Sequence, residues 1–162
     1  MKRPHSSLPA VNTHHPPRAS GHLHGWVGAE PWACVCATGT HDMSPLRAWW
    51  EEDRALTQRY YNEVLGCEGD APYFCEPWVA DLIVAQHMKS PAMLAILPLQ
   101  DWLATDGEVR YPGNPADERI NIPAIPRHYW RYRMHCTLES LIANDKFNGH
   151  IRTLVEAAAR NR

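Results

Sequence analysis

A histidine and an aspartate, His41 and Asp42, stand just after a short run of small and β-branched residues over 34–38. Ser44 and Pro45 follow, as a capping residue and a first helical proline would. The spacing predicts a strand, a tight turn that presents His41 and Asp42, and then a helix. In a (β/α)8 barrel, polar side chains at the carboxyl end of a strand are where catalysis takes place. The alternative role for Asp42 is an Asx-type turn that caps the following helix.

Three further groups of residues could bind a ligand. Gln100 and Asp101 follow the apolar run 93–97, which has the length and composition of a parallel strand buried on both faces. Asn121 lies in a segment rich in Gly, Pro and Asn, and a long loop of this kind in a compact domain is usually functional. The chain also has seven tryptophans, Trp130 among them; such side chains can stack on the apolar faces of sugar rings, although most large aromatic side chains form the core.

The remaining pattern predicts the elements that position these residues. Apolar side chains recur at helical spacing over 44–65, and Gly66 follows as a helix-ending glycine would. Further helices are predicted over 78–88, 137–144 and 147–159. The chain thus reads strand, helix, helix, strand, followed by a long loop over 106–126 and two helices. This order indicates an α/β fold with parallel strands.

Taken in order, several of these segments resemble the 4-alpha-glucanotransferases of glycoside hydrolase family 77, and most closely their long, cytosolic-type branch. The resemblance covers roughly residues 34–155. It rests on six motifs: Thr38-Gly-Thr-His-Asp42, Trp49-Trp-Glu-Glu-Asp53, Pro72-Tyr-Phe-Cys-Glu-Pro-Trp78, Met93-Leu-Ala-Ile-Leu-Pro-Leu-Gln-Asp-Trp102, Glu118-Arg-Ile-Asn-Ile-Pro123 and His128-Tyr-Trp-Arg-Tyr-Arg133.

The resemblance implies a fold and an activity. The fold would be the C-terminal portion of a (β/α)8 TIM barrel, an incomplete barrel with the last two strands and their helices. The activity would be transfer of alpha-1,4-glucan segments between maltooligosaccharides or glycans, without a cofactor or a metal. The family's nucleophilic aspartate and acid/base glutamate lie on earlier strands that have no counterpart here. We therefore expect a fragment that is inactive alone.

The resemblance also implies roles for individual residues. Asp42 matches the carboxylate that stabilises the transition state, and the residues that match substrate-binding positions are His41, Asn121, Gln100, Asp101 and Trp130. A structural role remains open for Asn121, for Trp130 and for the pair Gln100 and Asp101. Arg119 and Arg133 are expected to be structural partners of carboxylates.

Residues 1–32 differ from the rest of the chain, which we take as one domain over 33–162. They hold half of the ten histidines and almost no periodic apolar pattern, which predicts a disordered leader outside the family. Two alternative functions stay open. One is a non-catalytic glucan-binding remnant or partner of a full-length enzyme. The other is a metal-binding protein that uses His14, His15, His22 and His24.

Composition narrows the possible partners. The formal net charge is −2, which gives no basic surface for nucleic acid. No apolar run approaches the roughly 20 residues of a membrane helix, and no signal peptide is evident. The five cysteines lack a Cys-x-x-Cys motif, as expected of reduced thiols in a cytoplasmic protein.

The barrel-fragment interpretation also carries an expectation about solubility. Two strands without neighbours leave open edges, and Trp49, Trp50 and Trp102 would lose the side chains that cover them. We therefore expect the chain to aggregate or to bind hydrophobic dyes when it is produced alone.

Overall fold

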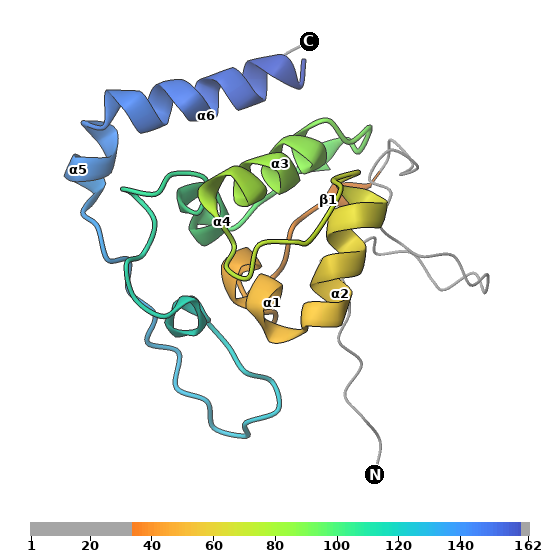
Figure 1. The fold of residues 1–162 in the computed structure, drawn as a ribbon. Helices are drawn as coiled ribbons and strands as arrows, with labels where there is room; N and C mark the ends of the chain where they lie inside the picture. Colours follow the sequence, from red (N-terminus) through yellow and green to blue (C-terminus); the bar gives the residue numbers. More distant parts are fainter. Residues whose placement is uncertain (1–33, 160–162) are drawn as a thin grey trace.

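The computed structural model describes residues 34–159, a helix-rich unit built on two short strands (Figure 1). Strand β1 (Val35–Cys36) pairs with β2 (Leu94–Ala95) in parallel, with Val35 opposite Leu94 and Cys36 opposite Ala95. The predicted parallel pairing is confirmed, although both strands are shorter than the apolar runs that predicted them. Because the strands are parallel, the segments that follow them leave from the same edge of the sheet.

The helix predicted over 44–65 is wrong as a single element. The structure has α1 (Leu46–Glu52), α2 (Arg54–Arg59) and a π-helical turn, η2 (Tyr60–Val64). Asp53 makes the break, since its backbone is extended and its side chain accepts a hydrogen bond from the amide of Leu56 at 3.0 Å. The predicted end is confirmed, because Gly66 has a φ of +67° in the left-handed region that favours glycine.

Two helices and a short turn form the middle of the chain. The predicted helix over 78–88 is observed as α3 (Pro77–Met88), with proline in its first turn. Helix α4 (Leu99–Leu103) follows β2 directly and therefore contains Gln100 and Asp101, which the sequence had suggested at the strand end. The predicted long loop over 106–126 is irregular apart from the 3₁₀ turn η3 (Pro115–Glu118).

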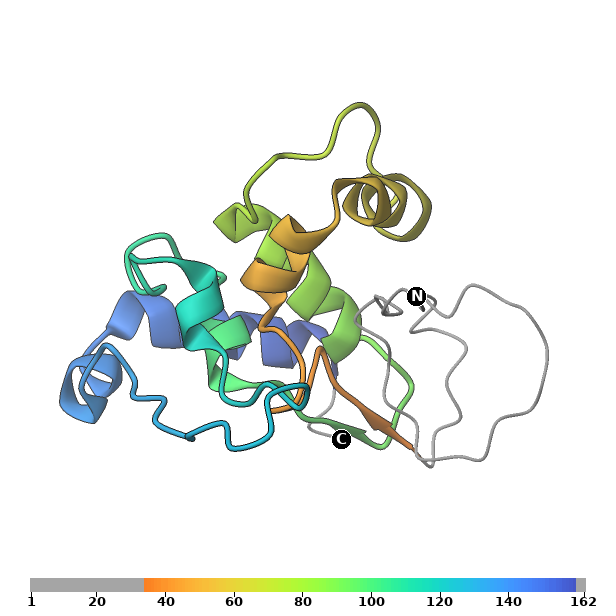
Figure 2. The ribbon, with the colours of Figure 1, turned by 90° about the horizontal axis from the view of Figure 1, so that it is seen from below.

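The two predicted C-terminal helices are also present, with shifted ends. Helix α5 (Leu138–Ile142) is capped by Thr137 as predicted, and α6 (Asp145–Ala157) is capped by Asn144. Figures 1 and 2 show α6 running beside α3, where His150 Nε2 lies 2.6 Å from an oxygen of Asp81.

The core lies between α1, η2 and α3. Trp49 and Trp50 are 6% and 1% exposed, so the expectation that they lose their covering side chains is wrong. Their rings make edge contacts with Tyr60 and Tyr61 respectively, at centroid distances of 5.3 and 6.5 Å. The two tryptophans are buried because helices within this chain cover them.

The sheet itself is less covered than its sequence suggests. Cys36 is fully buried, but Met93, Leu94 and Ile96 are 55%, 47% and 59% exposed. The prediction of a strand buried on both faces is therefore wrong for the described chain. A parallel strand is buried on both faces only within a wider covered sheet, whereas within residues 34–159 the one strand paired with β2 is β1.

Three sequence expectations concern features beyond this fold. The predicted leader over 1–32, with its histidines, lies outside the described residues. Within the described residues, no helix is long and apolar enough to cross a membrane. The five cysteines, all inside 34–159, form no disulfide.

Candidate functional site

The turn after β1 presents the predicted His-Asp pair to solvent. The amide of Met43 donates to the carbonyl of Thr40 at 3.0 Å, which closes the turn. The side chains of His41 and Asp42 are 53% and 49% exposed, and His41 Nε2 lies 3.4 Å from Asp42 Oδ1. An exposed carboxylate and an imidazole thus share one turn and can contact the same ligand.

The loop that carries Asn121 docks onto this turn through both side chain and backbone. Asn121 Nδ2 donates to Asp42 Oδ1 at 2.6 Å, and the Asn121 amide donates to the His41 carbonyl at 3.1 Å. The ring of Trp130 lies 5.1 Å from the ring of His41 and is more than half exposed. The structure therefore brings together four of the six predicted site residues, although Asn121 and Asp42 are 79 positions apart.

The side chain of Arg119 connects the turn to the loop through hydrogen bonds. The sequence alone did not predict this role. Arg119 Nε donates to the Asn121 carbonyl at 3.0 Å, and its Nη1 donates to the Ser44 hydroxyl at 3.1 Å. Its Nη2 lies 3.5 Å from the Asp42 carbonyl oxygen. The expectation that Arg119 pairs with a carboxylate is wrong, since all three partners are hydroxyl or carbonyl oxygens. The feature of the sequence that could have indicated this role is the position of Arg119, two residues before Asn121.

Gln100 and Asp101 lie deeper, under the turn. Both are buried, and Asp101 accepts hydrogen bonds from the Thr38 hydroxyl and, at 2.9 Å, from the Leu46 amide. Asp101, rather than Ser44 or Asp42, thus satisfies the first amide of α1. Burial raises the pKa of Asp101 to about 6, although both hydrogen bonds act in the opposite direction. The carboxylate is fully used within the protein, which favours the structural role.

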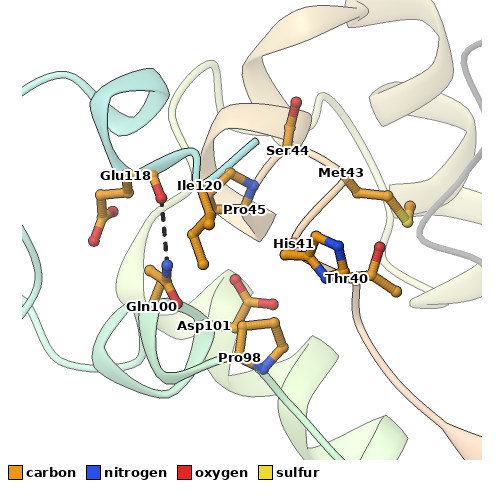
Figure 3. A pocket seen from close by; sticks show the side chains of 11 residues that line it. Thr40, His41, Met43, Ser44, Pro45, Pro98, Gln100, Asp101, Glu118 and Ile120 are labelled. Carbon is orange, nitrogen blue, oxygen red and sulfur yellow. Dashed lines mark hydrogen bonds between the residues drawn. The ribbon is translucent and has the colours of Figure 1, made fainter. Parts of the chain in front are cut away.

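The pocket between these segments is small, about 30 Å³ in volume, and most of its accessible wall is apolar (Figure 3). Figure 3 shows the His41 ring on one side and, on the other, the hydrogen bond from Gln100 Nε2 to the Glu118 carbonyl, 3.3 Å long. The residues that line it come from the turn, the start of α1, α4 and the 118–120 loop: Gly39, Thr40, His41, Met43, Ser44, Pro45, Pro98, Gln100, Asp101, Glu118 and Ile120.

A buried ion pair between Glu118 and Arg47 connects the loop that carries Asn121 to α1. Glu118 is 3% exposed, and one of its oxygens lies 3.5 Å from Arg47 Nη1. Burial raises the pKa of Glu118 to about 7 despite the attraction of Arg47. Arg47 also donates to the Tyr111 carbonyl at 2.8 Å. No periodicity in the sequence marks this pair, because the two residues belong to a helix and a loop that meet only in the fold.

These groups suit a ligand rich in hydroxyls. Asp42 can accept hydrogen bonds, the imidazole of His41 can donate or accept, and Trp130 offers an exposed ring for stacking. Within residues 34–159, no three His, Cys, Asp or Glu side chains gather as a metal site would require. The predicted metal-binding histidines of the alternative hypothesis lie outside that range.

Comparison with known proteins agrees with this chemistry. The profile of the family described as 4-alpha-glucanotransferase matches residues 24–139. The chain is 46% identical over 128 residues to 4-alpha-glucanotransferase DPE2 of Oryza sativa subsp. japonica, covering 78% of this chain and 13% of that protein. It is 29% identical to the 4-alpha-glucanotransferases of Chlamydia muridarum and Synechocystis sp., covering 74% and 78% of this chain and 22% and 21% of those proteins. The chain therefore spans less than a quarter of the length of each of these relatives.

Proposed function

Because this chain belongs to the 4-alpha-glucanotransferase family, we propose that it supplies part of the site that transfers alpha-1,4-glucan segments between maltooligosaccharides or glycans. The observation that carries the proposal is the meeting of Asp42 with Asn121, His41 and Trp130 from three separate segments. In this proposal the two strands are the last two of a (β/α)8 barrel, and the site lies at their carboxyl ends.

Asp42 is proposed to stabilise the transition state. As the glycosidic bond breaks, positive charge develops on the donor sugar ring, and hydrogen bonds from ring hydroxyls to a carboxylate strengthen. The interaction is stronger in the transition state than in the bound substrate, so it lowers the barrier. Asn121 holds the carboxylate through its amide, His41 contacts the same sugar, and Trp130 stacks against a ring. Gln100 and Asp101 support the turn from below.

The chain alone is proposed to lack turnover. Transfer with retention needs one carboxyl group as nucleophile and another as acid/base. Among the described residues beside the turn, Asp101 and Glu118 are buried and bonded within the protein, and Glu52 accepts a hydrogen bond from the Ser44 hydroxyl. The two reacting carboxyl groups would thus come from other segments. The cysteines without disulfides suit a cytoplasmic location.

The decisive experiment places residues 34–155 into a complete member of the family and replaces Asp42→Asn. The amide keeps the size of the side chain but loses the charge, so kcat for disproportionation of maltotriose should fall about 10²–10³-fold. KM should change far less, because the interaction belongs to the transition state. Asp70→Asn, in an exposed loop away from the site, is the matched control and should keep full activity. Near-full turnover with Asp42→Asn would refute the assigned role.

Experiments on this chain alone distinguish the glucan-binding remnant from a chain that catalyses transfer. We expect the 162-residue protein to release no glucose from maltotriose, with or without Asp42→Asn. Saturable binding of maltotriose without turnover, lost on Trp130→Ala, would favour the glucan-binding remnant. Turnover by the chain alone would show that it holds all the reacting groups.

A further inference from the structure

A second cavity lies on the other side of Arg119, between the 111–120 segment and the 128–135 segment, with a volume of about 340 Å³. This size is within the range of small-molecule sites. Its lining is rich in arginine, histidine and tyrosine, unlike the site at Asp42. The guanidinium of Arg131 makes no hydrogen bond or ion pair within the described residues, and Arg133 bonds only to the Tyr132 carbonyl, at 2.9 Å.

The walls of this cavity are held by specific contacts. His128 Nε2 lies 3.0 Å from the Ile120 carbonyl, and His135 Nε2 lies 2.8 Å from the Val109 carbonyl. Because a carbonyl only accepts, each Nε2 carries a proton. The rings of Tyr111 and His135 are 5.5 Å apart. Gly113 permits this arrangement, since a Cβ at that position would lie 2.7 Å from the ring of Tyr111.

The charge of the lining favours an anion. Arg119, Arg131 and Arg133 face two acidic residues, Asp117 and Glu118. Glu118 is already paired with Arg47, and burial further weakens its negative charge by raising its pKa to about 7. The arginines at positions 131 and 133 therefore remain without a carboxylate partner among the described residues.

Two tyrosines of the lining differ in what they offer a ligand. Tyr132 contributes to the wall, but its hydroxyl is buried out of reach of the cavity, so it does not contact a bound ligand. Tyr129, also in the lining, has 77% of its surface exposed and can stack on a sugar ring.

We propose that this cavity binds a phosphomonoester, with Arg131 and Arg133 donating to the phosphate oxygens and Tyr129 stacking on an attached sugar. Arginine forms paired hydrogen bonds to phosphate through its planar guanidinium, which a hydroxyl-rich neutral ligand does not need. The proposal does not depend on the transfer activity, since it concerns binding at a different cavity.

The test is calorimetric titration of the whole chain with inorganic phosphate, glucose 6-phosphate and glucose. We expect saturable binding of both phosphates with a Kd of about 1 mM or tighter, and none of glucose at the same concentrations. Tighter binding of glucose 6-phosphate would identify a sugar phosphate as the source of the group. Tighter binding of inorganic phosphate than of glucose 6-phosphate would mean that no attached sugar stacks on Tyr129, and would overturn the phosphomonoester.

Variants connect the binding to the named residues. Arg131→Gln and Arg133→Gln should each weaken phosphate binding about tenfold. Arg152→Gln, an exposed arginine on α6 outside the cavity, is the matched control and should bind as the original chain does. The melting temperature of each variant checks that it is folded. Absence of saturable phosphate binding to the original chain, or equal weakening by Arg152→Gln, would overturn the proposal.

Discussion

Asp101 shows how one buried carboxylate can organise several segments. It joins Thr38 after β1, the first amide of α1 and its own helix α4. Since burial outweighs these hydrogen bonds, the folded chain binds the Asp101 proton more tightly than the unfolded chain does, with a pKa of about 6 against 3.8. Unfolding therefore releases a proton between these pH values, and the free energy of unfolding falls as pH rises through them.

This linkage gives a prediction for Asp101→Asn. The amide oxygen can still accept from Leu46 and the amide nitrogen can donate to Thr38, but the group no longer titrates. Urea unfolding should show a smaller loss of stability between about pH 4 and pH 6 in the variant than in the original chain. Asp117→Asn, at an exposed position, should keep the original dependence. If the free energy of unfolding of Asp101→Asn changed with pH as that of the original chain does, the linkage would be contradicted.

At the level of residues, the sequence predicted the turn that presents His41 and Asp42, and it left open whether Gln100 and Asp101 are structural. The turn chemistry of His41 and Asp42 is local, so it could be predicted from neighbouring residues. The burial of Asp101 and the pairing of Glu118 with Arg47 depend on packing between distant segments. Arg119 was misassigned for the same reason, because its oxygen partners come from a turn 75 positions away.

At the level of elements, the sequence predicted which helices exist better than where they break. The apolar spacing over 44–65 continues through Asp53, so periodicity alone reports one helix. The break comes from the side chain of Asp53, which competes for the amide of Leu56 and starts a new helix. Helices α3 and α6 were found within two residues of their predicted limits, although Asn144, which caps α6, was predicted to end the preceding helix.

The break leads to a prediction about α2. Asp53→Ala removes the acceptor for the Leu56 amide and should lower the free energy of unfolding by about 1 kcal/mol. Asp53→Ser keeps a capping oxygen and should recover most of that loss. Chemical denaturation of the three proteins provides the measurement. A more stable Asp53→Ala would mean that the chain gains by joining α1 and α2 into one helix.

At the level of the whole molecule, the sheet is the incomplete part. The exposed residue Leu94 lies on β2 opposite the exposed Val35 on β1, and the exposed residues Met93 and Ile96 flank the strand. Exposed apolar strands of this kind are templates for association. The core around Trp50 is by contrast closed, so we place the predicted tendency to aggregate at the sheet and not at the tryptophans.

A charge on this face should reduce association. Ile96→Lys should lower the fluorescence of a bound hydrophobic dye and raise the soluble yield of the chain, since an exposed lysine blocks strand addition. Ile142→Lys, on the exposed surface of α5, adds the same charge elsewhere and should have less effect. Equal effects of the two variants would show that net charge, rather than the sheet, controls solubility.

The hydrogen bond between Asn121 and Asp42 also determines the order in which the chain can assemble. Closing a flexible loop of 79 residues costs roughly 4 kcal/mol of chain entropy, which exceeds the roughly 1.5–3 kcal/mol of one charge-assisted hydrogen bond. The pairing of β1 with β2 must therefore shorten the loop first. We expect the Asn121 amide to exchange its hydrogen faster than the Ile96 amide, which bonds to the Cys36 carbonyl at 2.9 Å. The turn that carries His41 and Asp42 would then form after the sheet and open before it.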